Sequence, residues 1–86
     1  MTLKEVGIVI GKKLQTRRAL SGKVIIDFEG VELKDGKMLI SAYGQGKTVA
    51  RAKANYCLHL RGQRLIVDAM LKTRKEIQLP PRITVK

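Results

Sequence analysis

The stretch from Met38 to Asp68 constrains the fold most, because several structural signals follow one another there without a linker. An apolar, strand-like run comes first, followed by Gly44-Gln45-Gly46-Lys47-Thr48. A helical pattern then leads through Gly62 to a second strand-like run over residues 64–69. A strand, a glycine-rich junction, a helix and a returning strand must therefore pack together within a short length of chain.

The helix is predicted over residues 48–61. Thr48 is a favourable N-cap, and Arg61-Gly62 is a typical C-terminal stop. Apolar side chains recur at the spacing of one buried helix face. They are Val49, Ala52, Tyr56 and Leu60. We expect Arg51 to project into solvent and Lys53 to lie at the edge of the buried face.

Residues 24–43 are predicted to form a long hairpin. Asp35-Gly36 separates two apolar runs, which is typical of a two-residue type I′ turn. This register pairs Leu33 with Met38 on the face that we expect to be buried. The hairpin therefore needs a helix to cover it.

The apolar alternation of this hairpin changes phase near Gly30. A β-bulge at Glu29-Gly30 would restore the phase, because a bulge adds an unpaired residue to one strand. With the bulge, Phe28 lies opposite Ala42 on the buried face.

The two ends of the chain complete a predicted single domain over residues 1–86. Residues 1–23 favour a short helix followed by a basic loop, Lys12 to Arg18. Residues 70–86 form a basic tail interrupted by Pro80-Pro81, after which Ile83 and Val85 are predicted to form a short edge strand. The predicted fold class is α+β: a small antiparallel sheet, made of the hairpin 24–43 and the strand 64–69, packed by one main helix over 48–61. Residues 24–69 are its β-β-α-β core.

Composition indicates a thin core and an intracellular protein. The chain of 86 residues has three aromatic side chains, Phe28, Tyr43 and Tyr56, so aliphatic side chains must supply most of the core. A homodimer would be one way to bury more surface. The one cysteine excludes an internal disulfide and a thiolate zinc cluster. Because the sequence also lacks a secretory signal and an apolar run of about 18 residues, we expect a cytoplasmic protein without a membrane span.

The charge of the chain indicates a phosphate-bearing partner. The formal net charge is +11, and it is unevenly distributed. Residues 1–23 and 41–86 are strongly basic, whereas residues 24–40 carry more acidic than basic side chains. A basic body with one acidic strip favours an oriented binding face, although two solvated basic surfaces would give the same pattern.

The sequence predicts no catalytic site, no cofactor and no metal site. Residues 41–48 resemble the P-loop pattern G-x-x-x-x-G-K-T, but Ser41 replaces its first glycine, and the parallel sheet of such enzymes does not fit a hairpin in 86 residues. Cys57 and His59 are two positions apart on a helix and so point in different directions. Asp27 and Glu29 would suit a hard cation, but an acidic strip on an exposed strand is the commoner arrangement.

Residues 44–53 resemble the last motif of double-stranded RNA-binding domains, G-x-G-x-S-K-K-x-A-K. That resemblance implies phosphate contacts from Lys47, Thr48 and Lys53, with Arg51 as an additional basic group. The paired lysines of the family fall on Val49 and Ala50 here. The strand–helix–strand order is also similar to the HicB type of antitoxin, and residues 43–80 resemble small accessory proteins encoded by phages and mobile elements.

We therefore expect a non-catalytic protein that binds duplex or structured nucleic acid, RNA or DNA, through its backbone. The glycine-rich turn and the helix N-terminus would hold phosphates, with low sequence specificity. The predicted binding residues are Lys37, Gly44, Gly46, Lys47, Thr48, Arg51, Lys53, Arg17, Arg18, Lys72, Arg74 and Lys75. The alternative is an inhibitor from a phage or mobile element that binds an acidic surface of a host protein, such as a nucleic-acid-guided nuclease.

Overall fold

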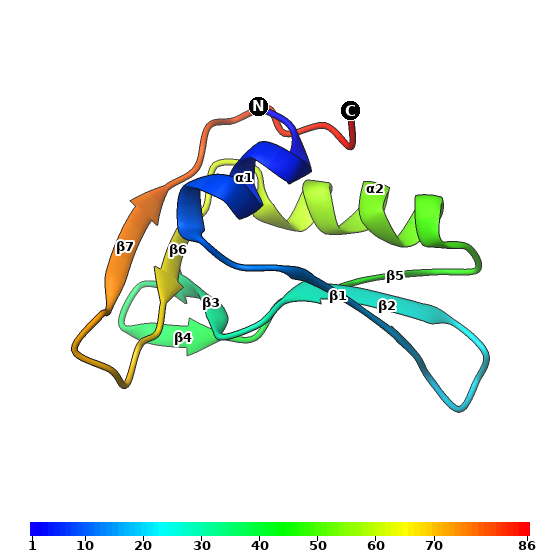
Figure 1. Ribbon diagram of the computed structural model, residues 1–86, viewed down its shortest axis with the longest axis horizontal. Coiled ribbons are helices and arrows are strands. Elements are labelled where there is room, and N and C mark those ends of the chain that lie inside the picture. Colours follow the sequence, from blue (N-terminus) through cyan, green and yellow to red (C-terminus); the bar gives the residue numbers. More distant parts are fainter.

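Two antiparallel sheets and two helices form the computed structural model, which describes residues 1–86 (Figure 1). One sheet has the strand order β1-β2-β5 and the other β4-β3-β6-β7. The elements are α1 (Leu3–Ile10), β1 (Leu14–Arg18), β2 (Val24–Phe28), β3 (Val31–Asp35), β4 (Met38–Ile40), β5 (Gly44–Gly46), α2 (Val49–Leu60), β6 (Arg64–Val67) and β7 (Lys75–Gln78). The predicted α+β class is confirmed, but the single predicted sheet is divided into two. Neither helix has the length and apolar character needed to cross a membrane.

Helix α1 confirms the predicted N-terminal helix. A capping box starts it, in which the Glu5 N–H donates to Thr2 Oγ1 at 3.2 Å and the Thr2 N–H donates to Glu5 Oε1 at 3.0 Å. Gly11 ends it in the left-handed region with φ +68. The buried residues of α1 are Leu3, Val6 and Ile10.

The basic loop predicted from Lys12 to Arg18 is wrong, because most of it is strand β1. Leu14 pairs with Phe28, and Arg18 pairs with Val24, so β1 lies along the whole of β2. This strand is mostly polar and exposed. Its own sequence therefore carries little apolar alternation, and its pairing with β2 determines its structure.

The β3–β4 hairpin is confirmed, but its predicted register is wrong. Leu33 pairs with Ile40 rather than with Met38, and Asp35 pairs with Met38. The loop is therefore Gly36-Lys37, one residue later than predicted. Gly36 has φ +61, which agrees with the glycine at the first loop position of type II′ turns. Met38 therefore pairs with Asp35 directly beside the turn, and its side chain is exposed.

The predicted bulge at Glu29-Gly30 is a larger break, at which the chain passes from one sheet to the other. Ile26 pairs with Gly44 in β5, whereas Leu33 pairs with Ile40 in β4. The chain has more residues between Ile26 and Leu33 than between Ile40 and Gly44, which lie on the opposite strand. These extra residues bend the long hairpin. The Ile26–Gly44 register is the one that the predicted Phe28–Ala42 pairing implies.

Helix α2 confirms the predicted main helix and lies across β5 and β2 (Figure 1). Tyr56 is buried, its ring centroid lies 5.7 Å from that of Phe28, and its hydroxyl oxygen accepts a 3.1 Å hydrogen bond from the Phe28 N–H. Burial raises the pKa of Tyr56 to about 12. Ala52 and Leu60 are buried as predicted, but Val49, the first residue of the helix, is 43% exposed.

The four-stranded sheet contains a strand that the sequence reasoning missed. Strand β6 lies within the predicted strand 64–69 and pairs on its far side with β7, so part of the predicted basic tail belongs to the sheet. Ile83 is buried, but the predicted edge strand is wrong. A single parallel bridge between Thr2 and Thr84 takes its place and brings the two ends of the chain together (Figure 1).

Candidate nucleic-acid interface

A polar cavity lies where the N-terminal end of α2, strand β5 and the β1–β2 hairpin meet. Its volume is about 680 Å³, and no hydrophobic residue lines it. The lining residues are Lys23, Gln45, Gly46, Lys47, Thr48, Arg51 and Asn55. The structure therefore brings together Gly46, Lys47, Thr48 and Arg51 of the predicted binding residues. We call this the basic cavity.

The cations of the basic cavity have no acidic partners. Lys23, Lys47 and Arg51 are all exposed, and none of them belongs to an ion pair of the protein. No carboxylate lines the cavity either. Their positive charges are therefore uncompensated within the protein and act on the same volume of solvent.

The N-terminus of α2 adds to this positive potential. The Arg51 N–H donates to Thr48 Oγ1 at 3.1 Å, as expected of an N-cap. The N–H groups of Val49 and Ala50 lie in the first turn of α2 and have no intrahelical acceptors. The aligned peptide dipoles of the helix also favour an anion at this end. Asn55 holds the opposite wall in place, because its Nδ2 donates to the Gln45 carbonyl at 2.6 Å.

The predicted glycine-rich turn is wrong, because Gly44–Gly46 is strand β5. Neither Gly44 nor Gly46 has a positive φ. Both glycines instead allow α2 to lie directly on the strand. A Cβ on Gly44 would lie 2.5 Å from the Tyr56 backbone nitrogen, and one on Gly46 would lie 2.6 Å from Arg51 Cγ. Gly46 thus shapes the cavity wall, while Gly44 is buried under α2 and does not line the cavity.

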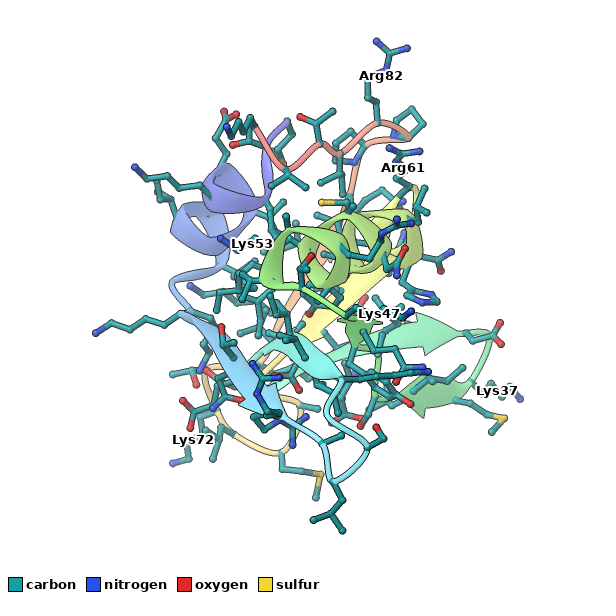
Figure 2. All side chains as sticks on the ribbon, turned by 90° about the vertical axis from the view of Figure 1, so that its right-hand side faces the viewer. Lys37, Lys47, Lys53, Arg61, Lys72 and Arg82 are labelled. Carbon is teal, nitrogen blue, oxygen red and sulfur yellow. The ribbon has the colours of Figure 1, made fainter.

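Other predicted binding residues lie on different surfaces. Lys53 lines a separate cavity beside α1, and Figure 2 shows it extending from α2 toward that helix. Lys37 lies in the β3–β4 turn, and Lys72 lies in the loop between β6 and β7. In Figure 2 both extend away from Lys47, on opposite sides of the molecule. The predicted continuous footprint is therefore divided into separate basic regions.

Four further predicted arginines and lysines also lie outside the basic cavity. Arg17 pairs with Asp27 at 3.0 Å, and the Arg18 guanidinium donates to the Gly22 carbonyl at 2.9 Å. Arg74 pairs with Glu76 at 3.3 Å, and Lys75 begins β7. Protein acceptors thus already engage the three arginine side chains, but not the side chain of Lys75.

Sequence reasoning missed Lys23, Gln45 and Asn55. Asn55 follows Arg51 by one helical turn, so the helix prediction alone places both on one face. Lys23 precedes Val24, which pairs with Gly46. Continuing the predicted Phe28–Ala42 register along the hairpin gives this same pairing, so that register contained the signal for Lys23.

The residues considered above for catalysis or metal binding do not lie together in the structure. Cys57 is buried, and burial raises the pKa of its thiol, whereas His59 is exposed. Asp27 pairs with Arg17. No three side chains among His, Cys, Asp and Glu gather as a metal site would require.

Comparison with known proteins does not identify a relative. No family model, no curated protein and no solved structure matches the chain. The resemblances to double-stranded RNA-binding domains, to HicB-type antitoxins and to phage accessory proteins stay predictions.

Proposed function

We propose that the protein binds nucleic acid without catalysis and that the basic cavity holds backbone phosphates. The observation that supports this most is the set of unpaired cations, Lys23, Lys47 and Arg51, around a cavity that no hydrophobic residue lines. Three separate elements converge on this cavity, and an ordinary surface of solvated lysines needs no such convergence. The β1–β2 hairpin, strand β5 and helix α2 each contribute to this wall.

The arginine and the two lysines contribute to this mechanism in different ways. Arg51 offers a planar guanidinium suited to two phosphate oxygens at once, whereas Lys23 and Lys47 act as point charges. The free N–H groups at the start of α2 supply further donors. Because all these groups recognise the phosphate and none of them a base edge, the sequence specificity should be low.

Duplex or structured nucleic acid fits this surface better than an unpaired strand. Proteins that bind single strands stack bases on aromatic side chains, and no aromatic residue lines the basic cavity. The direct test is fluorescence anisotropy with one duplex RNA, one duplex DNA and one single strand, at several salt concentrations. Log affinity should fall linearly with log salt, with a slope of about 0.9 for each DNA phosphate engaged.

The variant that tests the site is Lys47→Gln with Arg51→Gln. We expect it to reduce the salt slope by about two and to weaken duplex binding at least tenfold, roughly, at moderate salt. The matched control is Lys72→Gln with Lys75→Gln, which removes the same charge elsewhere. It should weaken binding far less. Equal losses in the two variants would contradict a localised site, and no binding at low salt would contradict the function.

A second candidate is binding to an acidic host protein, as an inhibitor from a phage or mobile element would do. Exposed apolar side chains at β4 and after it favour this candidate, since nucleic acid would not use them. They are Met38, Leu39, Ile40 and Tyr43. The anisotropy experiment separates the two candidates, because an inhibitor would bind generic duplexes poorly at physiological salt.

A further inference from the structure

A second cavity lies between α1, β1 and α2 and differs chemically from the basic cavity. Its volume is about 410 Å³, within the range of roughly 300–1,000 Å³ typical of small-molecule sites. Apolar side chains line it together with lysines. The lining residues are Leu3, Lys4, Gly7, Ile8, Lys12, Leu14, Phe28, Lys53 and Val85. We call it the amphipathic cavity.

The apolar part of the amphipathic cavity has a rigid floor and an exposed rim. Leu3 and Phe28 are buried members of the main core, so they fix the floor. Ile8 is 71% exposed, although it lines the cavity. Gly7 keeps α1 close to the floor, since a Cβ there would lie 3.1 Å from Phe28 Cε1. An apolar ligand would cover Ile8 and remove its surface from water.

The lysines of this cavity differ in how their charge is compensated. Lys12 Nζ donates to Asp68 Oδ1 at 2.7 Å, so a carboxylate already neutralises it. Lys4 and Lys53 belong to no ion pair. They come from different helices, α1 and α2, and line the same cavity. Two uncompensated ammonium groups beside an apolar floor favour an anion and disfavour a cation.

We propose that the amphipathic cavity binds a small organic anion with an apolar body. The apolar chain or ring covers Leu3, Ile8 and Phe28, and the carboxylate or phosphate lies against Lys4 and Lys53. This site does not depend on the proposed nucleic-acid function. A nucleic-acid backbone has no apolar group to cover Ile8, which is why the occupant is a small amphiphile. Lys53, for which the family resemblance implied phosphate contacts beside Lys47, thereby receives a different role.

The test is titration of the whole ¹⁵N-labelled protein with octanoate, octan-1-ol and octylammonium, followed by NMR. Octanoate should shift the amide signals of Gly7 and Ile8 and saturate with a Kd below about 1 mM. Octan-1-ol should bind about tenfold more weakly, because it makes no charge-assisted contact. Octylammonium should bind more weakly still.

Two variants with a matched control locate the site. Lys53→Gln should reduce octanoate affinity about tenfold and leave that of octan-1-ol unchanged. Ile8→Ser should weaken both ligands. Lys47→Gln removes the same charge from the basic cavity and should leave octanoate binding unchanged. The proposal is overturned if the three probes bind alike, if the shifts centre on residues 45–51, or if Lys47→Gln and Lys53→Gln lose octanoate equally.

Discussion

At the scale of single residues, glycine has two roles here, because it permits close approach at some positions and positive φ angles at others. Gly44 and Gly46 lie in an ordinary strand conformation, and helix α2 occupies the space where their side chains would be. The strand end and Arg51 are therefore held in contact. Gly36 has the other role, because its positive φ sets the β3–β4 turn. A sequence does not distinguish these two roles of glycine. The packing and the backbone angles of the structure do.

The first expectation concerns Gly44→Ala. The new Cβ would meet the Ala52 carbonyl oxygen and the Tyr56 backbone, neither of which can move without displacing α2. Overpacking of this kind costs about 1–3 kcal/mol, and contact with backbone should place Gly44→Ala at the upper end. Urea unfolding measures the loss in free energy.

The comparison variant is Gly22→Ala. Gly22 has φ +89 and no atom near its missing Cβ, so alanine there meets backbone strain without a clash. That strain costs about 1–2 kcal/mol. If Gly44→Ala is no less stable than Gly22→Ala, the close contact between α2 and β5 is not what requires glycine.

At the scale of elements, one ion pair fastens the chain after α1 to the end of β6. Asp68 accepts hydrogen bonds from Lys12 Nζ at 2.7 Å and from Thr73 Oγ1 at 3.2 Å. The hydrogen bond from Lys12 contributes most to lowering the pKa of Asp68 below its ordinary value of 3.8. Asp68 also has φ +53, a left-handed conformation that Asp and Asn tolerate best. The connection thus joins α1 to the four-stranded sheet.

We expect Asp68→Asn to lower stability at neutral pH and to do so less in acid. A carboxylate whose folded pKa is lowered contributes stability above its unfolded pKa, and this contribution disappears as pH falls through the folded pKa. The difference in Tm between the parent protein and Asp68→Asn should therefore narrow below about pH 4. Thermal unfolding between neutral and acidic pH measures it.

Asp35→Asn is the matched control for this experiment. Asp35 lies at the β3–β4 turn and makes no ion pair. Its replacement should change Tm little over the whole pH range. A Tm difference for Asp68→Asn that stays constant with pH would contradict the role given to the ion pair.

The sequence predicted the elements that carry local signals. Helix α2 has its N-cap Thr48 and its apolar face, and β6 is an apolar run followed by a change of composition, so both were located correctly. Strands β1 and β7 are mostly polar, and distant partners determine them. The β3–β4 turn lies one residue later than predicted, with Gly36 first, so each residue of β3 pairs two positions further along β4 than expected.

The part of the candidate site that lies at the start of α2 could be predicted from the sequence. Thr48 is the N-cap of α2, Lys47 directly precedes it, and Arg51 lies in the first turn, so their proximity follows from the start of the helix. Lys53 also follows Arg51 closely in sequence but points to another side of the helix, where α1 lies. The family resemblance grouped Lys53 with Lys47, and the position of α1 separates them.

At the scale of the whole molecule, the charge of +11 is distributed over several separate basic regions. Glu76 gathers Lys34, Arg64 and Arg74 at 3.3–3.5 Å on one sheet face, so part of the positive charge there is balanced. The basic cavity has no such carboxylate. Mutual repulsion among the remaining cations destabilises the folded state, and a polyanion would relieve it.

Salt should therefore have opposite effects on stability and on binding. Raising NaCl from about 20 to 200 mM shortens the screening length and should raise the Tm of the free protein. The same change should weaken duplex binding, because releasing counterions into a more concentrated salt solution gains less entropy. Differential scanning fluorimetry and anisotropy measure the two trends. A Tm that falls as salt rises would mean that attractive ion pairs outweigh the net repulsion.

The buried cysteine is an intrinsic probe of local opening in this protein. Cys57 is the one thiol, it is 1% exposed, and it lies in the middle of α2 among core side chains. A thiol reagent can reach it only when α2 lifts from the sheets or the chain unfolds. The rate at which Cys57 is modified therefore reports how often α2 opens. The same measurement applies to every variant described above and needs no added label. Slow labelling in the presence of duplex would show that the bound partner keeps the helix closed.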